Sequence, residues 1–136
     1  MLVTRHLPCY GAERALFRLT TLAAYMALEC MIFVELTPFA TFRGRIWSDE
    51  EFGELQEFLA LAPAAGTLIP GGGGLRKVRW LAQQRGKRGG ARVIYYWHAR
   101  EECIYLVHGY TKGGRDDLTR RQLKTLRGLL RDLLDG

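Results

Sequence analysis

Acidic residues are missing from one long stretch of this sequence. Between Phe58 and Arg100 there is no Asp or Glu, although the whole chain has 14 of them. The same stretch contains eight Lys or Arg residues. A solvated protein surface normally mixes charges of both signs. The imbalance therefore predicts a surface that meets an anion, and its clustering is stronger evidence than the modest net charge of +6.

Cysteines are few and scattered. The three of them, Cys9, Cys30 and Cys103, show neither the spacing of a metal site nor a disulfide framework. This usage is typical of a reducing cytoplasm. Four consecutive glycines at 71–74 lack the Gly-Lys-Ser/Thr ending of a nucleotide-binding loop and precede a strand rather than a helix. We therefore expect a cytoplasmic protein with no metal and no cofactor.

A long hydrophobic run is also absent. The apolar segment 19–28 is too short to span a bilayer. Glu13 lies where a signal peptide needs positive charge, and Glu29 lies where a small-residue cleavage site belongs. We predict that residues 1–30 are a non-essential extension, in which an early start codon has been chosen, and that 31–136 form one domain. The alternative is a short amphipathic helix packed on that domain.

The domain alternates between the periodicities of strands and helices. Ser48 and Glu51 form a capping box that predicts a helix start. Thr37 and Pro38 predict another, with Thr37 as the N-cap. The order is typical of an α+β domain. The predicted elements are a strand at 31–36, helices from 37 to about 47 and from 48 to about 62, strands at 75–81, 92–98 and 103–112, and a final helix capped by 116–119.

The first basic strand separates its side chains by strand alternation. Lys77 and Arg79 share one face, and Val78 and Trp80 share the other. The two cations are then about 6–7 Å apart, a spacing that suits one phosphodiester. A solvated sheet face is the alternative interpretation. The lack of acidic neighbours favours anion binding, and Arg92 opens the next strand.

Two histidines lie on the predicted sheet. His98 and His108 can each serve as a general base because imidazole titrates near neutrality, or each can be structural. His108 is the better candidate, since Tyr110 and Lys112 follow it on the same side of the same strand.

Several runs of this sequence resemble the RelE superfamily of toxins from bacterial toxin–antitoxin modules, most closely its HigB-like branch. The resemblance spans about residues 31 to 134. A long, specific run, Lys87-Arg-Gly-Gly-Ala-Arg-Val-Ile-Tyr-Tyr-Trp97, carries most of it. The other matching runs are 33–37, 49–52, 69–71, 73–79, 110–112 and 116–119.

The resemblance implies the fold and the activity of these toxins. We expect a RelE-like microbial RNase fold, with a small antiparallel sheet in β-α-α-β-β-β-α order and helices packed on one face. The implied activity is that of a ribosome-dependent, metal-independent mRNA endoribonuclease. In such an enzyme the RNA 2′-hydroxyl attacks the adjacent phosphorus. The implied partners are the 70S ribosome, mRNA and a cognate antitoxin, a small helix-turn-helix protein.

By the same resemblance, Lys77, Arg79, Arg92 and Lys112 match the basic residues that carry catalysis. Some relatives place a catalytic Tyr near the last helix, but segment 113–117 has none. Tyr110, His108 or Lys77 are therefore the candidates for proton transfer. Further RNA contacts are predicted for Arg76, Arg85, Lys87 and Arg88.

Two other functions are compatible with these residues. A ParE-like relative of the same fold poisons gyrase by protein contact. A plain RNA-binding module holds RNA through its cations, with steep salt dependence, and cleaves nothing. Expression followed by mapping of mRNA 5′ ends and measurement of DNA synthesis separates the three hypotheses.

Overall fold

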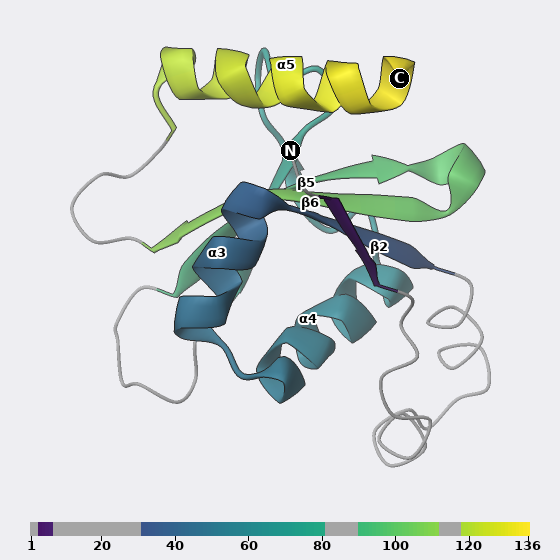
Figure 1. Ribbon diagram of the computed structural model, residues 1–136, viewed down its shortest axis with the longest axis vertical. Helices are drawn as coiled ribbons and strands as arrows, with labels where there is room; N and C mark the ends of the chain where they lie inside the picture. Colours follow the sequence, from purple (N-terminus) through teal and green to yellow (C-terminus); the bar gives the residue numbers. More distant parts are fainter. Residues whose placement is uncertain (1–2, 7–30, 81–89, 112–117) are drawn as a thin grey trace.

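A computed structural model describes residues 3–6, 31–80, 90–111 and 118–136 of the protein. In these residues the chain forms one sheet flanked by helices (Figure 1). The predicted α+β class is confirmed, and so is the predicted order of elements from residue 31 onward, apart from one additional two-residue strand, β3. The elements are β1 (Val3–His6), β2 (Ile32–Leu36), α3 (Thr37–Ile46), α4 (Asp49–Leu61), β3 (Thr67–Leu68), β4 (Arg76–Trp80), β5 (Ala91–His98), the 3₁₀ turn η2 (Ala99–Glu101), β6 (Cys103–Thr111) and α5 (Arg120–Asp135).

The sheet is mixed rather than wholly antiparallel as predicted. Its strand order among the described residues is β1-β2-β6-β5-β4-β3. Strand β2 pairs with β6 in parallel, and all the other neighbours are antiparallel. A parallel pair needs a long crossover connection. Here α3, α4 and the first part of the meander supply it. The final three long strands form the predicted meander, with β5 at its centre.

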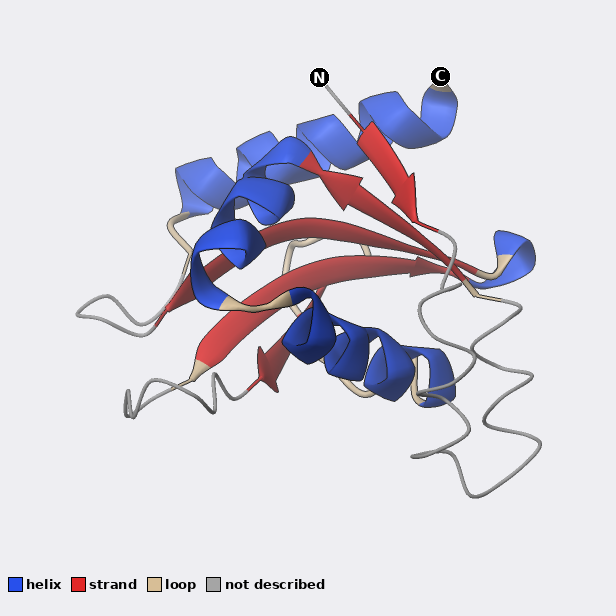
Figure 2. Ribbon diagram, turned by 60° about the horizontal axis from the view of Figure 1, so that its bottom comes forward, coloured by secondary structure: helices blue, strands red, loops and turns tan. Residues whose placement is uncertain are grey.

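The helices divide between the two faces of the sheet, which corrects the prediction that they pack on one face (Figures 1 and 2). Helices α3 and α4 cover one face, where Phe39 and Leu55 belong to the same buried cluster as Val93. Helix α5 covers the other, where its Leu126 and Leu130 pack with Ile94. Most side chains of β5 on both faces are apolar, because the strand is central and covered on both sides.

Helix starts follow their capping residues, with one shift. The Ser48 hydroxyl accepts a hydrogen bond from the Glu51 amide, and the Glu51 carboxylate accepts one from the Ser48 amide. Thr119 and Gln122 make the same reciprocal pair at the start of α5. Helix α3, in contrast, begins at Thr37 with Leu36 as its N-cap. The predicted cap at Thr37 was wrong by one residue, because strand β2 runs directly into the helix.

Strand β1 comes from the segment that we predicted to be dispensable. It pairs antiparallel with β2, with Val3 opposite Leu36 and His6 opposite Phe33. The apolar segment 19–28 lies outside the described residues, so the prediction about residues 1–30 stays a prediction. Within the described ranges, no helix has the length and apolar character that a bilayer crossing needs.

A buried ion pair ties β2 to both helices on its face. Glu35 is 2% exposed. Its carboxylate accepts a hydrogen bond of 2.6 Å from Arg43 Nε. The same guanidinium donates to Asp49 at 3.0 Å and lies 4.3 Å from the centre of the Phe52 ring. A buried carboxylate needs such partners, because an unpaired buried charge is costly.

We predict that Glu35→Ala lowers the free energy of unfolding by about 3–5 kcal/mol, because the largely buried Arg43 loses its buried partner and keeps only the exposed Asp49. Asp49→Ala is the matched control. Asp49 pairs with the same guanidinium, but its side chain is 66% exposed. We therefore expect this variant to lose at most about 1 kcal/mol of unfolding free energy. Urea denaturation of both variants measures the difference. Equal losses would contradict a dominant role for the buried pair.

Candidate nucleic-acid interface

Strand β4 presents two of its three cations, Lys77 and Arg79, on the face that α5 covers. Val78 and Trp80 pack in the cluster beneath α3 and α4. Leu75, just before the strand, belongs to the opposite cluster with α5. Alternation places Lys77 and Arg79 on the same side as Leu75, as predicted. Lys77 is half-buried, and Arg79 is exposed.

Arg92 extends the cationic row across the sheet. Its neighbours Ala91 and Val93 pack toward α3 and α4, so Arg92 points toward the α5 face. It lies directly opposite Arg79 on one side and Tyr110 on the other. Residues opposite each other on antiparallel strands have Cβ atoms about 4.5–5.5 Å apart. Arg92 is only 6% exposed, so packing holds its side chain between the two neighbouring strands.

An irregularity in β6 places His108 on this face. The register shifts so that Tyr95 lies opposite Leu106 while Ile94 lies opposite His108, which leaves Val107 as an extra residue. Val107 packs with α5. A Cβ on Gly109 would clash with the Phe42 ring of α3, so Gly109 faces the other layer. His108 and Tyr110 therefore both point toward α5.

We call Lys77, Arg79, Arg92, His108 and Tyr110 the basic face. It consists of two adjacent rows across three strands. Arg79, Arg92 and Tyr110 form one row, and Lys77 and His108 flank Ile94 in the next. Three of the five side chains carry a fixed positive charge. Strand pairing therefore brings together residues that are 33 positions apart in the sequence.

His108 is the titratable member with a perturbed environment. Its ring centre lies 6.2 Å from that of Tyr110. Its Nδ1 atom is buried and has no hydrogen-bond partner among the described residues. Burial lowers the pKa of His108 from its ordinary value of 6.5. The imidazole is thus neutral at pH 7 and able to accept a proton.

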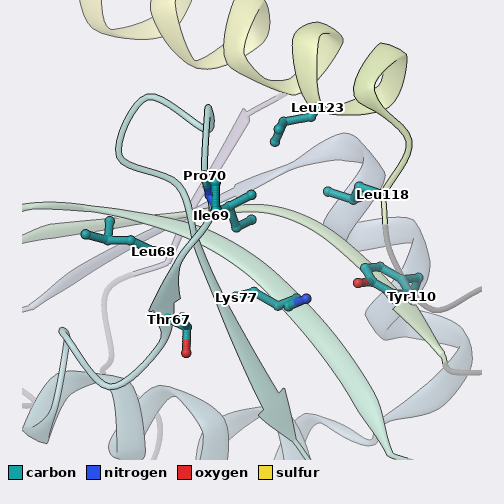
Figure 3. Close-up of a pocket in the computed structure, with 8 residues that line it drawn as sticks. All are labelled: Thr67, Leu68, Ile69, Pro70, Lys77, Tyr110, Leu118 and Leu123. Carbon is teal, nitrogen blue, oxygen red and sulfur yellow. The ribbon is translucent and has the colours of Figure 1, made fainter.

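A pocket of about 200 Å³ opens beside the basic face (Figure 3). Lys77 and Tyr110 form its polar side. Its apolar side comes from two segments that are distant in the sequence, the start of α5 and the β3 loop. The lining consists of Lys77, Tyr110, Thr67, Leu68, Ile69, Pro70, Leu118 and Leu123. A mixed apolar and cationic pocket of this kind suits a ligand that has both a flat apolar part and an anionic group.

Not all of the predicted site residues join this face. Arg76 points to the opposite layer, where its guanidinium donates to the carbonyl of Gly66 at 2.9 Å and to that of Ala64 at 3.3 Å. His98 lies at the far end of β5. Four predicted residues, Arg85, Lys87, Arg88 and Lys112, lie outside the described residues. The RNA contacts of Arg76, Arg85, Lys87 and Arg88, and the catalytic role of Lys112, stay predictions.

No cluster of metal-ligating side chains occurs in the part of the chain that the structure describes. There, no three or more His, Cys, Asp or Glu side chains gather closely enough to hold an ion. The chemistry that the basic face itself offers is electrostatic. Fixed guanidinium and ammonium groups stabilise negative charge on a phosphate oxygen as it develops. A neutral imidazole beside them can take up a proton.

Sequence reasoning did not find two features of the site. The first is the irregularity of β6 that turns His108 toward α5. Gly109 in a strand interior was an available signal, since such glycines often mark a bulge or a close backbone approach. The second is the apolar wall of the pocket. Leu118 and Leu123 have the ordinary spacing of core leucines, so no sequence signal distinguishes them.

A comparison with protein families agrees with this architecture. Residues 60–135 match the family described as the RelE toxin of the RelE/RelB toxin–antitoxin system. The matched region begins at the end of α4 and includes the whole meander and α5. It therefore contains every residue of the basic face.

The burial of His108 predicts a pH dependence of stability. Its pKa is lower in the folded state than in the unfolded chain, so the unfolded chain binds the proton first. We expect the free energy of unfolding to fall as the pH drops below about 6.5 toward the folded-state pKa. His108→Gln removes this contribution. Urea midpoints of the wild type and of His108→Gln at pH 7.5 and 5.5 measure this contribution. An equal loss of stability between the two pH values in both proteins would contradict a lowered pKa of His108.

Proposed function

Because the chain belongs to the RelE toxin family, we propose that it is a ribosome-dependent mRNA endoribonuclease of the HigB-like branch. As a toxin of a toxin–antitoxin system, it has an antitoxin as its partner. The finer assignment rests on one observation above all. Three strands of the meander direct Lys77, Arg79 and Arg92, together with His108 and Tyr110, to one face beside a pocket.

In the proposed reaction, the RNA acts as its own nucleophile. The 2′-oxygen forms a bond to the adjacent phosphorus, and the bond from that phosphorus to the 5′-oxygen breaks. The proton of the 2′-hydroxyl goes to a base, and an acid protonates the leaving 5′-oxygen. The products are a 2′,3′-cyclic phosphate and a free 5′-hydroxyl. No external water, oxidant or cofactor enters this step.

The cations of the basic face support this chemistry. Charge grows on the non-bridging oxygens as the phosphorus becomes five-coordinate, and fixed cations stabilise the transition state more than the ground state. Arginine suits this role because its guanidinium stays charged and binds two oxygens at once. Arg92 is held by burial and Arg79 lies opposite it, so we assign both to the phosphate. Lys77 is placed at the pocket, within reach of the same group.

His108 is our candidate for the base. It is neutral at pH 7 because burial lowers its pKa, and a neutral imidazole can accept the 2′-hydroxyl proton. Tyr110 lies beside it and is the candidate for protonating the leaving oxygen. Lys77 is the alternative base, because its amine lies on the same face and lines the pocket with Tyr110. Lys112 is the remaining basic candidate carried by the family resemblance.

The setting of the reaction follows from the same proposal. The substrate is mRNA on the 70S ribosome in the cytoplasm. The proposed antitoxin is a small helix-turn-helix protein that holds the enzyme inactive. We propose the domain as residues 31–136. The sheet pairing of β1 makes deletion of residues 1–30 a direct test of that boundary.

We predict that induced wild-type protein arrests growth and that Lys77→Ala combined with Arg92→Ala relieves the arrest. Loss of one transition-state contact of this kind typically lowers kcat by about 10²–10³, so the pair removes nearly all cleavage. Mapping of mRNA 5′ ends shortly after induction measures it. New 5′-hydroxyl ends should appear with the wild-type protein and not with this double variant.

The matched control carries Arg45→Ala with Arg100→Ala, two exposed cations away from the basic face. It loses the same charge and should arrest growth like the wild type. Because Arg92 is buried, thermal unfolding should verify that the double variant folds. Arrest of DNA synthesis with intact mRNA would favour gyrase poisoning instead, and RNA binding without new ends would favour a non-catalytic module.

A further inference from the structure

A second cationic pocket lies at the other end of the seam between α5 and the loop that precedes β4. We call residues 71–74 the glycine turn. Gly72 and Gly73 of this turn line a pocket of about 160 Å³ with Arg127 and Arg131 of α5. Leu130, Leu134 and Asp135 complete its lining. It shares no lining residue with the pocket beside the basic face.

The two arginines are presented together toward the glycine turn. They are four positions apart on one helix, so their side chains lie on the same side. Leu126 and Leu130 are buried against the sheet and fix the orientation of α5. Both arginines are exposed, and neither has a carboxylate within 4.0 Å among the described residues. The pocket lining therefore holds two arginines and one carboxylate, Asp135, and is positive overall.

The glycine turn adds hydrogen-bond donors beside these cations. Gly71, Gly73 and Gly74 have positive φ angles of 72°, 65° and 102°. Their amides donate to no acceptor among the described residues, whereas the Gly72 amide donates to the Ile69 carbonyl at 2.9 Å. Successive backbone amides in turns of mixed handedness form anion-binding concavities. The turn and the arginines thus provide two independent kinds of donor to an anion.

Glycine also allows Arg127 to lie close to the centre of this turn. A Cβ at Gly73 would lie 3.3 Å from Arg127 Nε, which is tighter than an ordinary contact. The absent side chain lets the guanidinium lie directly against the backbone. The same position requires a left-handed backbone, which other residues adopt only with strain.

We propose that Arg127, Arg131 and the glycine turn form a phosphate-binding site for the backbone of RNA, separate from the site of cleavage. This inference rests on the proposed function for the identity of the anion. Guanidinium groups and backbone amides suit the tetrahedral phosphate group. Asp135 borders the pocket and opposes the anion at that end.

Helix α5 links this second site to the first. Leu123 lines the pocket beside the basic face. Arg127 and Arg131 follow it by four and eight residues, or about 6 and 12 Å along the helix axis. A single RNA strand can therefore reach both sites, or a second RNA segment can occupy the distal one. In either case the site anchors RNA without contacting the scissile phosphate.

Salt dependence of RNA binding tests the site directly. We compare the wild-type chain with Arg127→Gln/Arg131→Gln, using a labelled 12-nucleotide single-stranded RNA whose 2′-hydroxyls are methylated to prevent cleavage. Each lost phosphate contact lowers the slope of log K against log[salt] by about 0.7. The double variant should therefore lose about 1.4. Arg45→Gln/Arg100→Gln removes the same net charge elsewhere and should leave the slope unchanged.

Two further variants test the geometry. Gly73→Ala adds the methyl group that displaces Arg127 and should weaken binding without removing any charge. Asp135→Asn removes the opposing carboxylate and should strengthen binding. An unchanged slope in the arginine variant, or an equal loss in the Arg45/Arg100 control, overturns the proposal. Thermal unfolding of each variant verifies that it is folded, which is expected because both arginines are exposed.

A crosslink distinguishes the source of the RNA. Gly128 is exposed, and no atom lies within 4 Å of a Cβ built there. Gly128→Cys therefore carries a photoreactive group next to Arg127 on programmed 70S ribosomes. A crosslink to mRNA or to ribosomal RNA supports the proposal and identifies the strand. A crosslink only to protein overturns it. The salt-dependence slope is measured without ribosomes. It therefore tests the phosphate-binding site whether or not the chain cleaves mRNA.

Discussion

Strand alternation across β4, β5 and β6 is the constraint on which the rest of this structure depends. Each strand sends every second side chain to each face. On one face these positions are apolar and pack under α3 and α4. On the other they change along the strands from apolar, under the leucines of α5, to cationic. A shift of one residue in any of these strands would bury the cations and expose the core, so the fold and the site specify each other.

In the proposed mechanism, the basic face acts through the fixed positions of its cations rather than through a single reactive group. Its cations come from β4 and β5, and its histidine and tyrosine come from β6. The pairing of these strands is set by a core on both sides. Arg92 is buried between Arg79 and Tyr110, so little reorganisation is needed when charge develops on a bound phosphate. Helix α5 completes the arrangement. Its leucines hold it on the sheet, and its exposed arginines extend the positive surface toward the glycine turn.

Local signals in the sequence predicted much of this architecture. The capping residues Ser48 and Thr119 marked two helices, and alternation placed Lys77 and Arg79 on one face. These features depend on neighbours in the sequence. The parallel pairing of β2 with β6 and the placement of α5 on the opposite face could not be predicted in this way. They result from competition among apolar surfaces of the folded chain. The extra residue at Val107 could not be predicted either, because it depends on how β5 and β6 pair.

The chemical identity of the RNA ends tests the central claim most directly. Purified protein is added to 70S ribosomes programmed with a defined mRNA, in the presence of EDTA at a concentration that ribosomes tolerate, and the ends at the cut are analysed. Attack by the 2′-hydroxyl predicts a 2′,3′-cyclic phosphate on the upstream fragment and a 5′-hydroxyl on the downstream one. A 5′-phosphate with a 3′-hydroxyl, or no cut at all, would contradict the account.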